Sequence, residues 1–524
     1  MPLASSTRLI FLLVLLISGA AAGEPNAKID EASSRPSPLG INFHRIRPHS
    51  TELTFVDIFR TSRRWKAKSR SRSDTPPRDR NPSQAPALDV DEHGWVRSLA
   101  PNQRVESGLL TTLNGRLPSG TYTLLHEGSG SIDISGARLE VTGPGQYDVH
   151  LKGKTRSLSV RIRSTNPADP IRNIRVILPG FRSSYRQKPF HPDFLDRWDR
   201  FQVVRFMDWM ETNDSKIERW SDRPLVEDWA QGTDAGVALE ILIDLANTLG
   251  ADPWFSIPHL ADDEYVRNFA ALVKKRLDPG LRAYIEYSNE LWNGQFEQAQ
   301  YARRRGRALG LAKDTDLAGL RFTARRSVEI FAIFEEVFGG TDRLVRVLPS
   351  QYSSPLKGRE ILSFEKAYEH ADVYAVAPYF GGRLTGKNSD RLREGSVDAL
   401  LAELGKEMEG HAEMMRNNAK LAEEFGLRLV AYEGGQHLRG PRGDDRFTQL
   451  LTDANRHPGM AALYAQHLAN WKEAGGTLFV HFSSMGKYGD TGSWGALEWP
   501  DQGRAEAPKY RALLDFISRN PRWW

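Results

Sequence analysis

Two glutamates, Glu290 and Glu433, each stand at the end of a short apolar run. The runs are residues 284–288 and 429–432, and their β-branched and aromatic side chains predict buried strands. A carboxyl group held at a strand end can protonate a glycosidic oxygen, while a second carboxylate about 5–5.5 Å away attacks the anomeric carbon. A single Asn-Glu pair could arise by chance, because average composition yields roughly one such dipeptide per several hundred residues. The two glutamates together predict glycoside hydrolysis with retention, provided that a scaffold brings them close.

The chain between and around these glutamates alternates strand-like and helix-like segments, which indicates βαβ units and a parallel sheet. Amphipathic helices are expected at 235–249, between Thr233 as a cap and Gly250 as a stop, and at 318–338. The expected barrel strands are 39–42, 203–206, 254–257, 284–288, 344–348, 373–377, 429–432 and 478–482. Eight strands suit a (β/α)8 TIM barrel. A doubly wound open sheet is the competing architecture, but no Gly-x-Gly-x-x-Gly turn follows a strand. The sequence therefore favours the α/β barrel.

Polar and aromatic residues gather just past the expected strand ends, which is the face where barrel enzymes hold their active sites. Each has a structural alternative: Arg205 could pair with a core carboxylate, and His259 is as readily a packing residue as a catalytic one. Their shared location favours a functional interpretation for the group. Its members are Arg205, Asp208, Trp209, His259, Asp262, Tyr379, His481, Ser483 and Trp494.

The two glutamate segments resemble clan A of the retaining glycoside hydrolases, which includes cellulase-like, xylanase-like and β-xylosidase-like enzymes. That clan carries an Asn-Glu pair at the end of barrel strand four, often with a glutamate four residues earlier, and Glu286, Asn289 and Glu290 match. Its nucleophile lies at the end of strand seven, commonly before a glycine, as Glu433 does. Two positions differ: Ser288 stands where a tryptophan is frequent, and a leucine replaces the usual proline after the acid/base.

The resemblance implies catalytic roles for Glu290 as acid/base and Glu433 as nucleophile. It also implies that Asn289 bonds the sugar 2-hydroxyl, that Arg205 and Tyr379 contact the nucleophile, and that Trp494 forms a sugar platform. With the aromatic and polar neighbours of the strand ends, the expected substrate-binding residues are Asn289, Arg205, Trp209, His259, Trp292, Tyr379 and Trp494.

The expected mechanism requires opposite protonation states for the two glutamates. Glu290 must hold a proton, which burial against Trp292 and Tyr287 and repulsion by a nearby carboxylate favour. Glu433 must stay ionised, with help from Arg205 if that side chain reaches it. A positioned general acid typically contributes about 10²–10⁴-fold in rate. This chemistry requires neither a metal nor a cofactor, and we expect none.

Residues 89–94 begin like a calcium-binding loop, but Ala100 stands where the closing glutamate belongs. A polar turn is the favoured interpretation. The sequence contains no Walker-type phosphate loop, no His-Glu-x-x-His zinc motif and no Gly-x-Ser-x-Gly elbow.

The N-terminus predicts export. Arg8 precedes the apolar stretch 9–17, and three alanines at 20–22 precede Gly23, as in a cleavable signal peptide spanning residues 1–22. The apolar stretch is short for a membrane span, so an uncleaved anchor is the lesser alternative, and no later stretch is long and apolar enough. With no cysteine, the chain can form no disulfide and carry no lipoprotein anchor. We expect a secreted or periplasmic bacterial protein without an integral membrane segment after cleavage.

The region between the first expected strand and the rest of the barrel changes character twice. Residues 39–62 hold that strand and the segment after it, and residues 63–87 are rich in Arg, Ser and Pro, which is typical of a linker. Residues 88–165 contain short alternating runs separated by Gly, Ser or Pro, which predict a small antiparallel β-sandwich inserted into the barrel. Residues 166–524 supply the remaining catalytic barrel.

Charge and aromatic content define the expected partners. The net charge is +5, and eleven of the 13 tryptophans lie at or after Trp198, where their rings could stack on sugars or fill the core. The basic linker could attract a polyanion, but it lacks interleaved aromatics for base stacking, so no nucleic-acid partner is expected. The expected partner is a polysaccharide or oligosaccharide substrate. A catalytically silent polysaccharide-binding or scaffold protein on the same fold is the alternative.

Overall fold

Eight parallel strands form a closed barrel in the computed structural model, which describes residues 37–69, 88–152, 155–382 and 392–524. The ring closes where β1 (Leu39–Asn42) pairs with β10 (Val203–Arg205) on one side and with β18 (Gly476–Phe482) on the other. The other barrel strands are β11 (Asp252–Ile257), β12 (Ala283–Tyr287), β13 (Leu344–Pro349), β14 (Val373–Val376) and β16 (Arg428–Ala431). The predicted (β/α)8 barrel is confirmed, because every expected strand lies in this ring.

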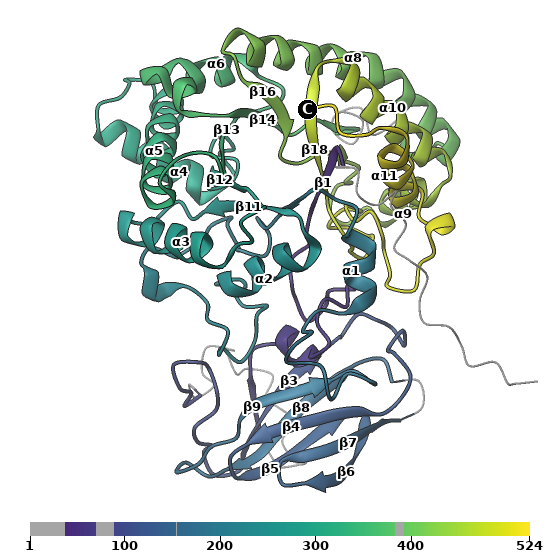
Figure 1. The fold of residues 1–524 in the computed structure, drawn as a ribbon. Helices are drawn as coiled ribbons and strands as arrows, with labels where there is room; N and C mark the ends of the chain where they lie inside the picture. Colours follow the sequence, from purple (N-terminus) through teal and green to yellow (C-terminus); the bar gives the residue numbers. More distant parts are fainter. Residues whose placement is uncertain (1–36, 70–87, 153–154, 383–391) are drawn as a thin grey trace, which may run out of the picture. The chain divides into compact units, whose positions relative to one another are not determined.

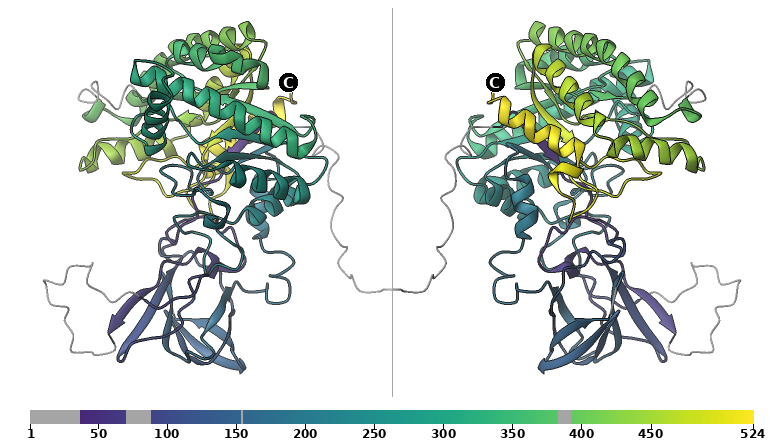
Figure 2. Two further views of the ribbon diagram at one scale, coloured as in Figure 1. Left: turned by 90° about the vertical axis from the view of Figure 1, so that its left-hand side faces the viewer. Right: turned by 90° about the vertical axis from the view of Figure 1, so that its right-hand side faces the viewer.

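Helices surround the strands (Figure 1), and the side views in Figure 2 show the same enclosure. The α-helices are α1 (Pro192–Trp198), α2 (Leu239–Leu249), α3 (Asp263–Arg276), α4 (Glu297–Ala308), α5 (Thr315–Phe338), α6 (Pro355–Ser363), α8 (Val397–Glu424), α9 (Asp445–Arg456), α10 (Gly459–Glu473) and α11 (Pro508–Arg519). The 3-10 helices are η2 (Ile58–Thr61), η4 (Trp220–Asp222), η5 (Phe364–His370) and η6 (Arg504–Glu506). This alternation of strand and helix places all the strand C-terminal ends on one face of the barrel.

The two predicted helices exist, with shifted starts. Helix α2 begins at Leu239 and Thr233 does not cap it, because Gly236 adopts a φ of 86° and closes a turn with Thr233 instead. Its end is as predicted, with Gly250 in the left-handed conformation. Helix α5 starts three residues before the predicted position, where Asp314 accepts a hydrogen bond from a first-turn amide.

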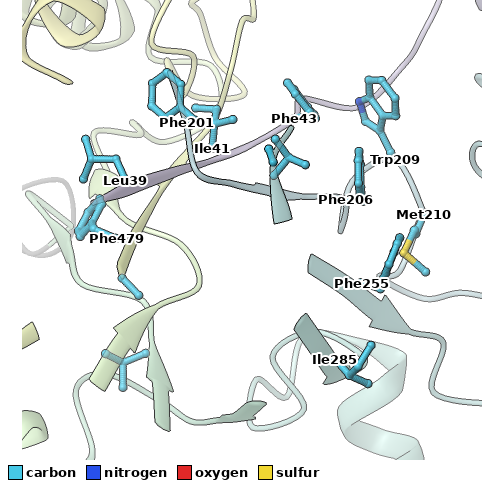
Figure 3. Packing of buried hydrophobic residues seen from close by; sticks show 14 of the residues in the cluster. Leu39, Ile41, Phe43, Phe201, Phe206, Trp209, Met210, Phe255, Ile285 and Phe479 are labelled. Atoms are coloured by element: carbon cyan, nitrogen blue, oxygen red, sulfur yellow. The ribbon is translucent and has the colours of Figure 1, made fainter. Parts of the chain in front are cut away.

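The barrel strands bury both of their faces. Inside the ring, Trp254 and Tyr284 stack with ring centroids 5.1 Å apart, in a cluster with valines and alanines of neighbouring strands. On the outer faces, side chains such as Leu39 and Phe255 enter the larger core beneath the helices (Figure 3). Burial on both faces explains why these strands are continuous apolar runs rather than alternating ones.

The antiparallel sheets extend beyond the predicted range 88–165. The two four-stranded sheets are formed by β2 (Lys66–Ser69), β3 (Gln103–Leu109), β8 (Leu158–Thr165) and β5 (Gly130–Ser135), and by β6 (Ala137–Gly143), β7 (Gln146–Leu151), β4 (Tyr122–Glu127) and β9 (Arg172–Ile177). β2 falls in the predicted linker and β9 in the predicted barrel segment. β2 is a charged edge strand without apolar alternation, so only its pairing with β3 reveals it. All of these strands lie between β1 and β10 in the sequence, so the sheets are an insertion into the barrel.

The described residues cover only some of the remaining predictions about the chain. The signal segment 1–22 and linker residues 70–87 lie outside the described residues. Within the described ranges, no helix is long and apolar enough to cross a membrane, and no three His, Asp or Glu side chains are grouped as metal ligands. Residues 89–94 form a turn in which the Asp91 carboxylate accepts hydrogen bonds from the amides of His93 and Trp95.

Candidate active site

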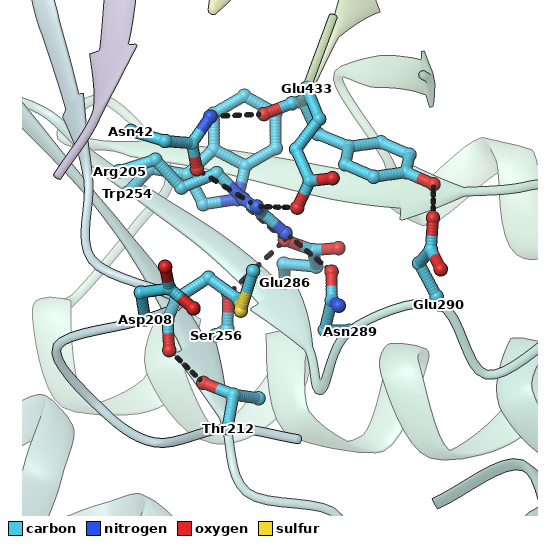
Figure 4. A network of polar contacts seen from close by, with 12 residues as sticks. Asn42, Arg205, Asp208, Thr212, Trp254, Ser256, Glu286, Asn289, Glu290 and Glu433 are labelled. Atoms are coloured by element: carbon cyan, nitrogen blue, oxygen red, sulfur yellow. Dashed lines mark hydrogen bonds and ion pairs between the residues drawn. The ribbon is translucent and has the colours of Figure 1, made fainter. Parts of the chain in front are cut away.

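Glu290 and Glu433 follow the C-terminal ends of β12 and β16, on the same face of the barrel (Figure 4). After β12 the backbone turns sharply, because Ser288 and Glu290 adopt φ values of 56° and 46°. Such a conformation costs about 1–3 kcal/mol for a residue other than glycine and is often found at functional sites. The Gln298 side chain donates to the Asn289 carbonyl at 2.9 Å and holds the turn. The turn thereby presents two consecutive polar side chains, Asn289 and Glu290.

Arg205 is fully buried at the end of β10 and connects four other residues (Figure 4). Its guanidinium donates to Glu433 Oε1 at 2.9 Å and to Glu286 Oε2 at 2.8 Å. It also donates to the side-chain oxygens of Asn289 at 2.9 Å and Asn42 at 3.0 Å. One cation therefore sits between two carboxylates and holds both amide side chains in place.

Glu433 has the partners of an ionised carboxylate. Arg205 donates to its Oε1, and the Tyr379 hydroxyl donates to its Oε2 at 2.9 Å. A two-stranded sheet of β15 (Tyr379–Phe380) and β17 (Gly435–Gln436) brings the tyrosine to this position. Burial raises the pKa of Glu433 and the charge of Glu290 adds to this rise, whereas Arg205 and Tyr379 oppose it. With a guanidinium at 2.9 Å, Glu433 is the glutamate of the pair whose surroundings favour the charged form.

Glu290 has neutral partners. The Asn293 amide donates to its Oε2 at 2.9 Å, and the Tyr432 hydroxyl donates to its Oε1 at 3.2 Å. No Lys, Arg or His within the described ranges forms an ion pair with it. Burial raises the pKa of Glu290 and the neighbouring charge of Glu286 adds to this rise, whereas the hydrogen bonds from Asn293 and Tyr432 and the more distant charge of Arg205 oppose it. If the two glutamates share one proton, these surroundings therefore favour Glu290 as its holder.

Glu286 is a third, fully buried carboxylate beneath the pair. Its Oε2 accepts from Arg205, from the Trp254 indole at 2.9 Å and from the Ser256 hydroxyl at 3.3 Å. Three side chains therefore donate to Glu286 Oε2, and Glu286 in turn positions Arg205.

A group of aromatic side chains lies beside Glu433. Tyr379 and Trp494 lie 6.0 Å apart between ring centroids, and Trp494 is half-buried. His437 lies 4.9 Å and Phe482 5.9 Å from Trp494. These last two residues were not predicted, although Phe482 ends an expected strand and His437 follows Glu433 by four positions. The structure thus combines Glu433 with an aromatic wall suited to the apolar face of a sugar.

Two of the predicted substrate-binding residues, Trp209 and His259, are buried packing residues, and a third, Trp292, is half-buried. Trp209 is 1% exposed and donates to the His44 carbonyl at 3.0 Å, within an aromatic cluster under α1. His259 is 2% exposed, packs edge-on against Tyr301, and has its pKa lowered to about 4 by burial. Trp292 packs against the outer core. Sequence spacing placed all three just after strand ends, but it does not report which way a side chain points.

Other members of the predicted polar group have structural roles. Asp262 caps α3 by accepting from the Tyr265 amide at 2.7 Å. His481 and Ser483 are fully buried, and burial lowers the pKa of His481 well below its usual range. Asp208 lies 3.9 Å from Arg45, near the edge of the same barrel face.

Comparison with known proteins yields similarity in structure alone. No protein-family model and no curated protein sequence matches the chain. Solved structures that match include a 4-O-α-L-rhamnosyl-β-D-glucuronidase from Fusarium oxysporum 12S, at 12% identity, a TM-score of 0.38 and coverage of 60% of this chain and 61% of that one. A family 51 α-L-arabinofuranosidase from Bifidobacterium longum matches at 12% identity and a TM-score of 0.40, over 63% of this chain and 68% of that one. A Bacteroidetes-affiliated GH5 cellulase matches at 13% identity and a TM-score of 0.38, over 63% and 84% of the two chains. At these values the fold assignment rests on the strand pairing of the barrel itself.

Proposed function

We propose that this protein is a retaining β-glycosidase that cleaves a polysaccharide or oligosaccharide by double displacement. One observation carries the proposal: two glutamates, Glu433 buried and Glu290 half-buried, follow two strands of one barrel face, one held by a guanidinium and the other by neutral donors. That difference in surroundings matches the difference in protonation that the mechanism requires.

In the first step Glu433 acts as the nucleophile. Its ionised Oε attacks the anomeric carbon while the proton of Glu290 moves to the glycosidic oxygen, so that the C–O bond breaks and the alcohol leaves. The product is a glycosyl ester of Glu433 and an ionised Glu290. Tyr379 and Arg205 hold Glu433 in place for attack.

In the second step Glu290 acts as a base. It takes a proton from water, the resulting oxygen nucleophile attacks the anomeric carbon, and the ester bond to Glu433 breaks. Tyr432 and Asn293 stabilise the ionised form of Glu290 that this step begins with. Glu433 returns to its ion pair with Arg205, and Glu290 is protonated again.

Asn289 is placed to recognise the sugar. Its side-chain oxygen is occupied by Arg205, and its Nδ2 donates to Asn213 Oδ1 at 3.0 Å. The second hydrogen of Nδ2 is available for a sugar hydroxyl, in agreement with the expected contact to the 2-hydroxyl. The aromatic wall around Trp494 would hold the apolar face of the same sugar.

The proposal includes export of the enzyme to the periplasm or medium, on the basis of the N-terminal sequence pattern. Loss of an N-terminal segment of about 22 residues from the protein recovered outside the cytoplasm, measured by intact mass, would support it.

The decisive experiment is Glu433→Gln, which keeps the shape of the side chain and removes its nucleophilic charge. Turnover of the aryl β-glycoside that the wild type cleaves should fall by at least about 10⁴-fold, a loss expected for a residue that acts as a unit with its partner. Glu409→Gln, on an exposed position of α8 where the side chain is 87% exposed, is the matched control. Proton NMR of the first product should show the β-anomer.

Unchanged turnover in Glu433→Gln would refute the nucleophile assignment, and an α-anomer as first product would refute retention. If wild-type protein binds oligosaccharides from a broad panel but cleaves none, the silent polysaccharide-binding alternative replaces the proposal.

A further inference from the structure

A cavity of about 580 Å³ lies beside the antiparallel sheets, and none of its lining residues belongs to the candidate active site. Three arginines line it: Arg60, Arg175 and Arg186. Arg60 and Arg186 also line an adjacent cavity of about 500 Å³. The guanidinium groups of Arg60 and Arg186 therefore lie at the wall between the two cavities.

Neighbouring groups neutralise the other charges of the larger cavity. Its carboxylate, Glu127, accepts from the Asn173 amide at 3.0 Å and lies 3.6 Å from the Arg172 guanidinium. Arg175 lies 3.5 Å from the carboxylate of Asp57. Glu127 and Arg175 therefore each have a partner of opposite charge already.

Arg60 and Arg186 differ from these residues, because neither has a carboxylate within ion-pair distance in the described part of the chain. The Arg60 guanidinium lies 5.7 Å from the Phe55 ring centroid, and that of Arg186 lies 5.5 Å from the Tyr185 ring centroid. The Nε of Arg186 also donates to the Tyr185 hydroxyl at 2.9 Å. Contact with a ring orients a guanidinium plane and leaves its terminal N–H donors available.

The surroundings of Arg60 point to a ligand. Its side chain is half-buried, burial lowers its pKa, and the charge of Asp57 opposes that shift. An arginine remains charged in a protein, and none of the guanidinium nitrogens of Arg60 is sealed off from the open cavity. A bound anion would supply an acceptor there, and a planar group with two oxygens fits the guanidinium fork best.

We propose that this cavity binds a carboxylate group of an acidic saccharide chain, with Arg60 and Arg186 as the anion ligands. The carbohydrate nature of the ligand rests on the proposed function, whereas its charge rests on the arginines. The net charge of +5 attracts a polyanion at longer range. The site would hold an acidic chain at a second point, separate from the cleavage site.

Binding of an oligogalacturonate hexamer, measured by titration calorimetry at low salt, tests this proposal without any need for turnover. The methyl ester of the same hexamer is the neutral comparison, and inorganic sulfate and phosphate are the small-anion comparisons. The variants are Arg60→Gln and Arg186→Gln. Arg138→Gln is the matched control, because Arg138 lies on β6 of the same sheets, is 61% exposed, pairs with Glu140 and does not line the cavity.

We expect the free hexamer to bind and its methyl ester to bind at least tenfold more weakly. Each cavity variant should weaken binding of the hexamer by about tenfold or more, as loss of a charge-assisted hydrogen bond predicts. Binding of the hexamer to Arg138→Gln, and the turnover of a neutral aryl glycoside by all variants, should stay at wild-type values. Arg186 is exposed, so Arg186→Gln tests the proposal even if Arg60→Gln does not fold.

Three results would overturn the proposal. These are equal affinity for the hexamer and its methyl ester, equal losses of affinity in Arg138→Gln and Arg186→Gln, and sulfate or phosphate binding as tightly as the hexamer. A protein that binds the hexamer at these arginines but cleaves no glycoside would sink the proposed function and leave this site intact.

Discussion

Removing one hydroxyl from Tyr432 should separate the acid and base roles of Glu290. Tyr432 immediately precedes Glu433, and its hydroxyl donates to Glu290 Oε1 at 3.2 Å. Tyr432→Phe removes this donor and keeps the fully buried ring, which also contacts the Arg205 guanidinium at 5.1 Å. The variant therefore tests one hydrogen bond with little change in packing.

The size of the effect follows from the charge of the acceptor. A hydrogen bond to an ionised group contributes about 1.5–3 kcal/mol, and at 3.2 Å the lower part of that range applies. Since the donor stabilises the carboxylate form, its loss raises the pKa of Glu290, by about one unit for each 1.4 kcal/mol. The alkaline limb of the kcat/KM profile should therefore move about one unit to higher pH. In the step in which Glu290 acts as a base it must be ionised, so the acid limb of that step should move to higher pH by the same amount.

Two aryl β-glycosides of the preferred sugar, one with a good and one with a poor leaving group, report on the two steps. With the good leaving group, deglycosylation limits turnover, so the acid limb of its kcat profile should move to higher pH. Tyr374→Phe is the matched control, because Tyr374 is equally buried, lies on β14, and bonds Asn418 Oδ1 at the same distance of 3.2 Å. An alkaline limb that stays in place in Tyr432→Phe, or moves equally in Tyr374→Phe, would refute the reasoning.

Two further predictions concern pH. Tyr379→Phe removes the 2.9 Å donor to Glu433 Oε2 and so raises the pKa of Glu433. The acid limb of the kcat/KM profile should therefore move to higher pH while the alkaline limb stays in place. A shift of the acid limb to lower pH would contradict the role of Tyr379. Glu52 is buried, and burial raises its pKa from 4.5 to about 7, so its contribution to folding is complete below about pH 4.5 and is lost as pH rises through 7. At about 1.4 kcal/mol per pKa unit, this loss of stability is about 3 kcal/mol. Glu52→Gln should remove it, so the unfolding free energy from urea titrations should depend less steeply on pH. An unchanged slope would contradict the raised pKa of Glu52.

The hydrogen bonds of Arg205 join several segments of the barrel to the candidate site. Its hydrogen-bond partners come from β1, from β12 and the turn after it, and from the residue after β16. A shift of any of these segments would change the partners of Glu433 directly, because the same guanidinium joins them. The position of the Glu433 carboxylate therefore depends on the pairing of the barrel strands.

Local pattern was sufficient for the elements of the barrel and for its two proposed catalytic residues. The strands after which Glu290 and Glu433 stand are continuous apolar runs, and such runs form wherever both faces of a strand are buried, so their positions could be recognised without the fold. Gly250 likewise marked the end of α2, because a left-handed residue is a local requirement. Strands β2 and β9 were assigned to the wrong segments, since only pairing with distant strands distinguishes them.

Tertiary structure decided which polar and aromatic side chains share a site. Trp209 and Trp494 both follow strand ends in the sequence, yet Trp209 is enclosed in the core while Trp494 lies beside Tyr379. Their directions depend on packing against residues more than a hundred positions away, such as His44 for Trp209 and Tyr379 for Trp494, which no local pattern encodes. The same holds for the protonation of the glutamate pair: its residue types are visible in the chain, but burial and the position of one buried guanidinium set which carboxyl group is suited to hold the proton.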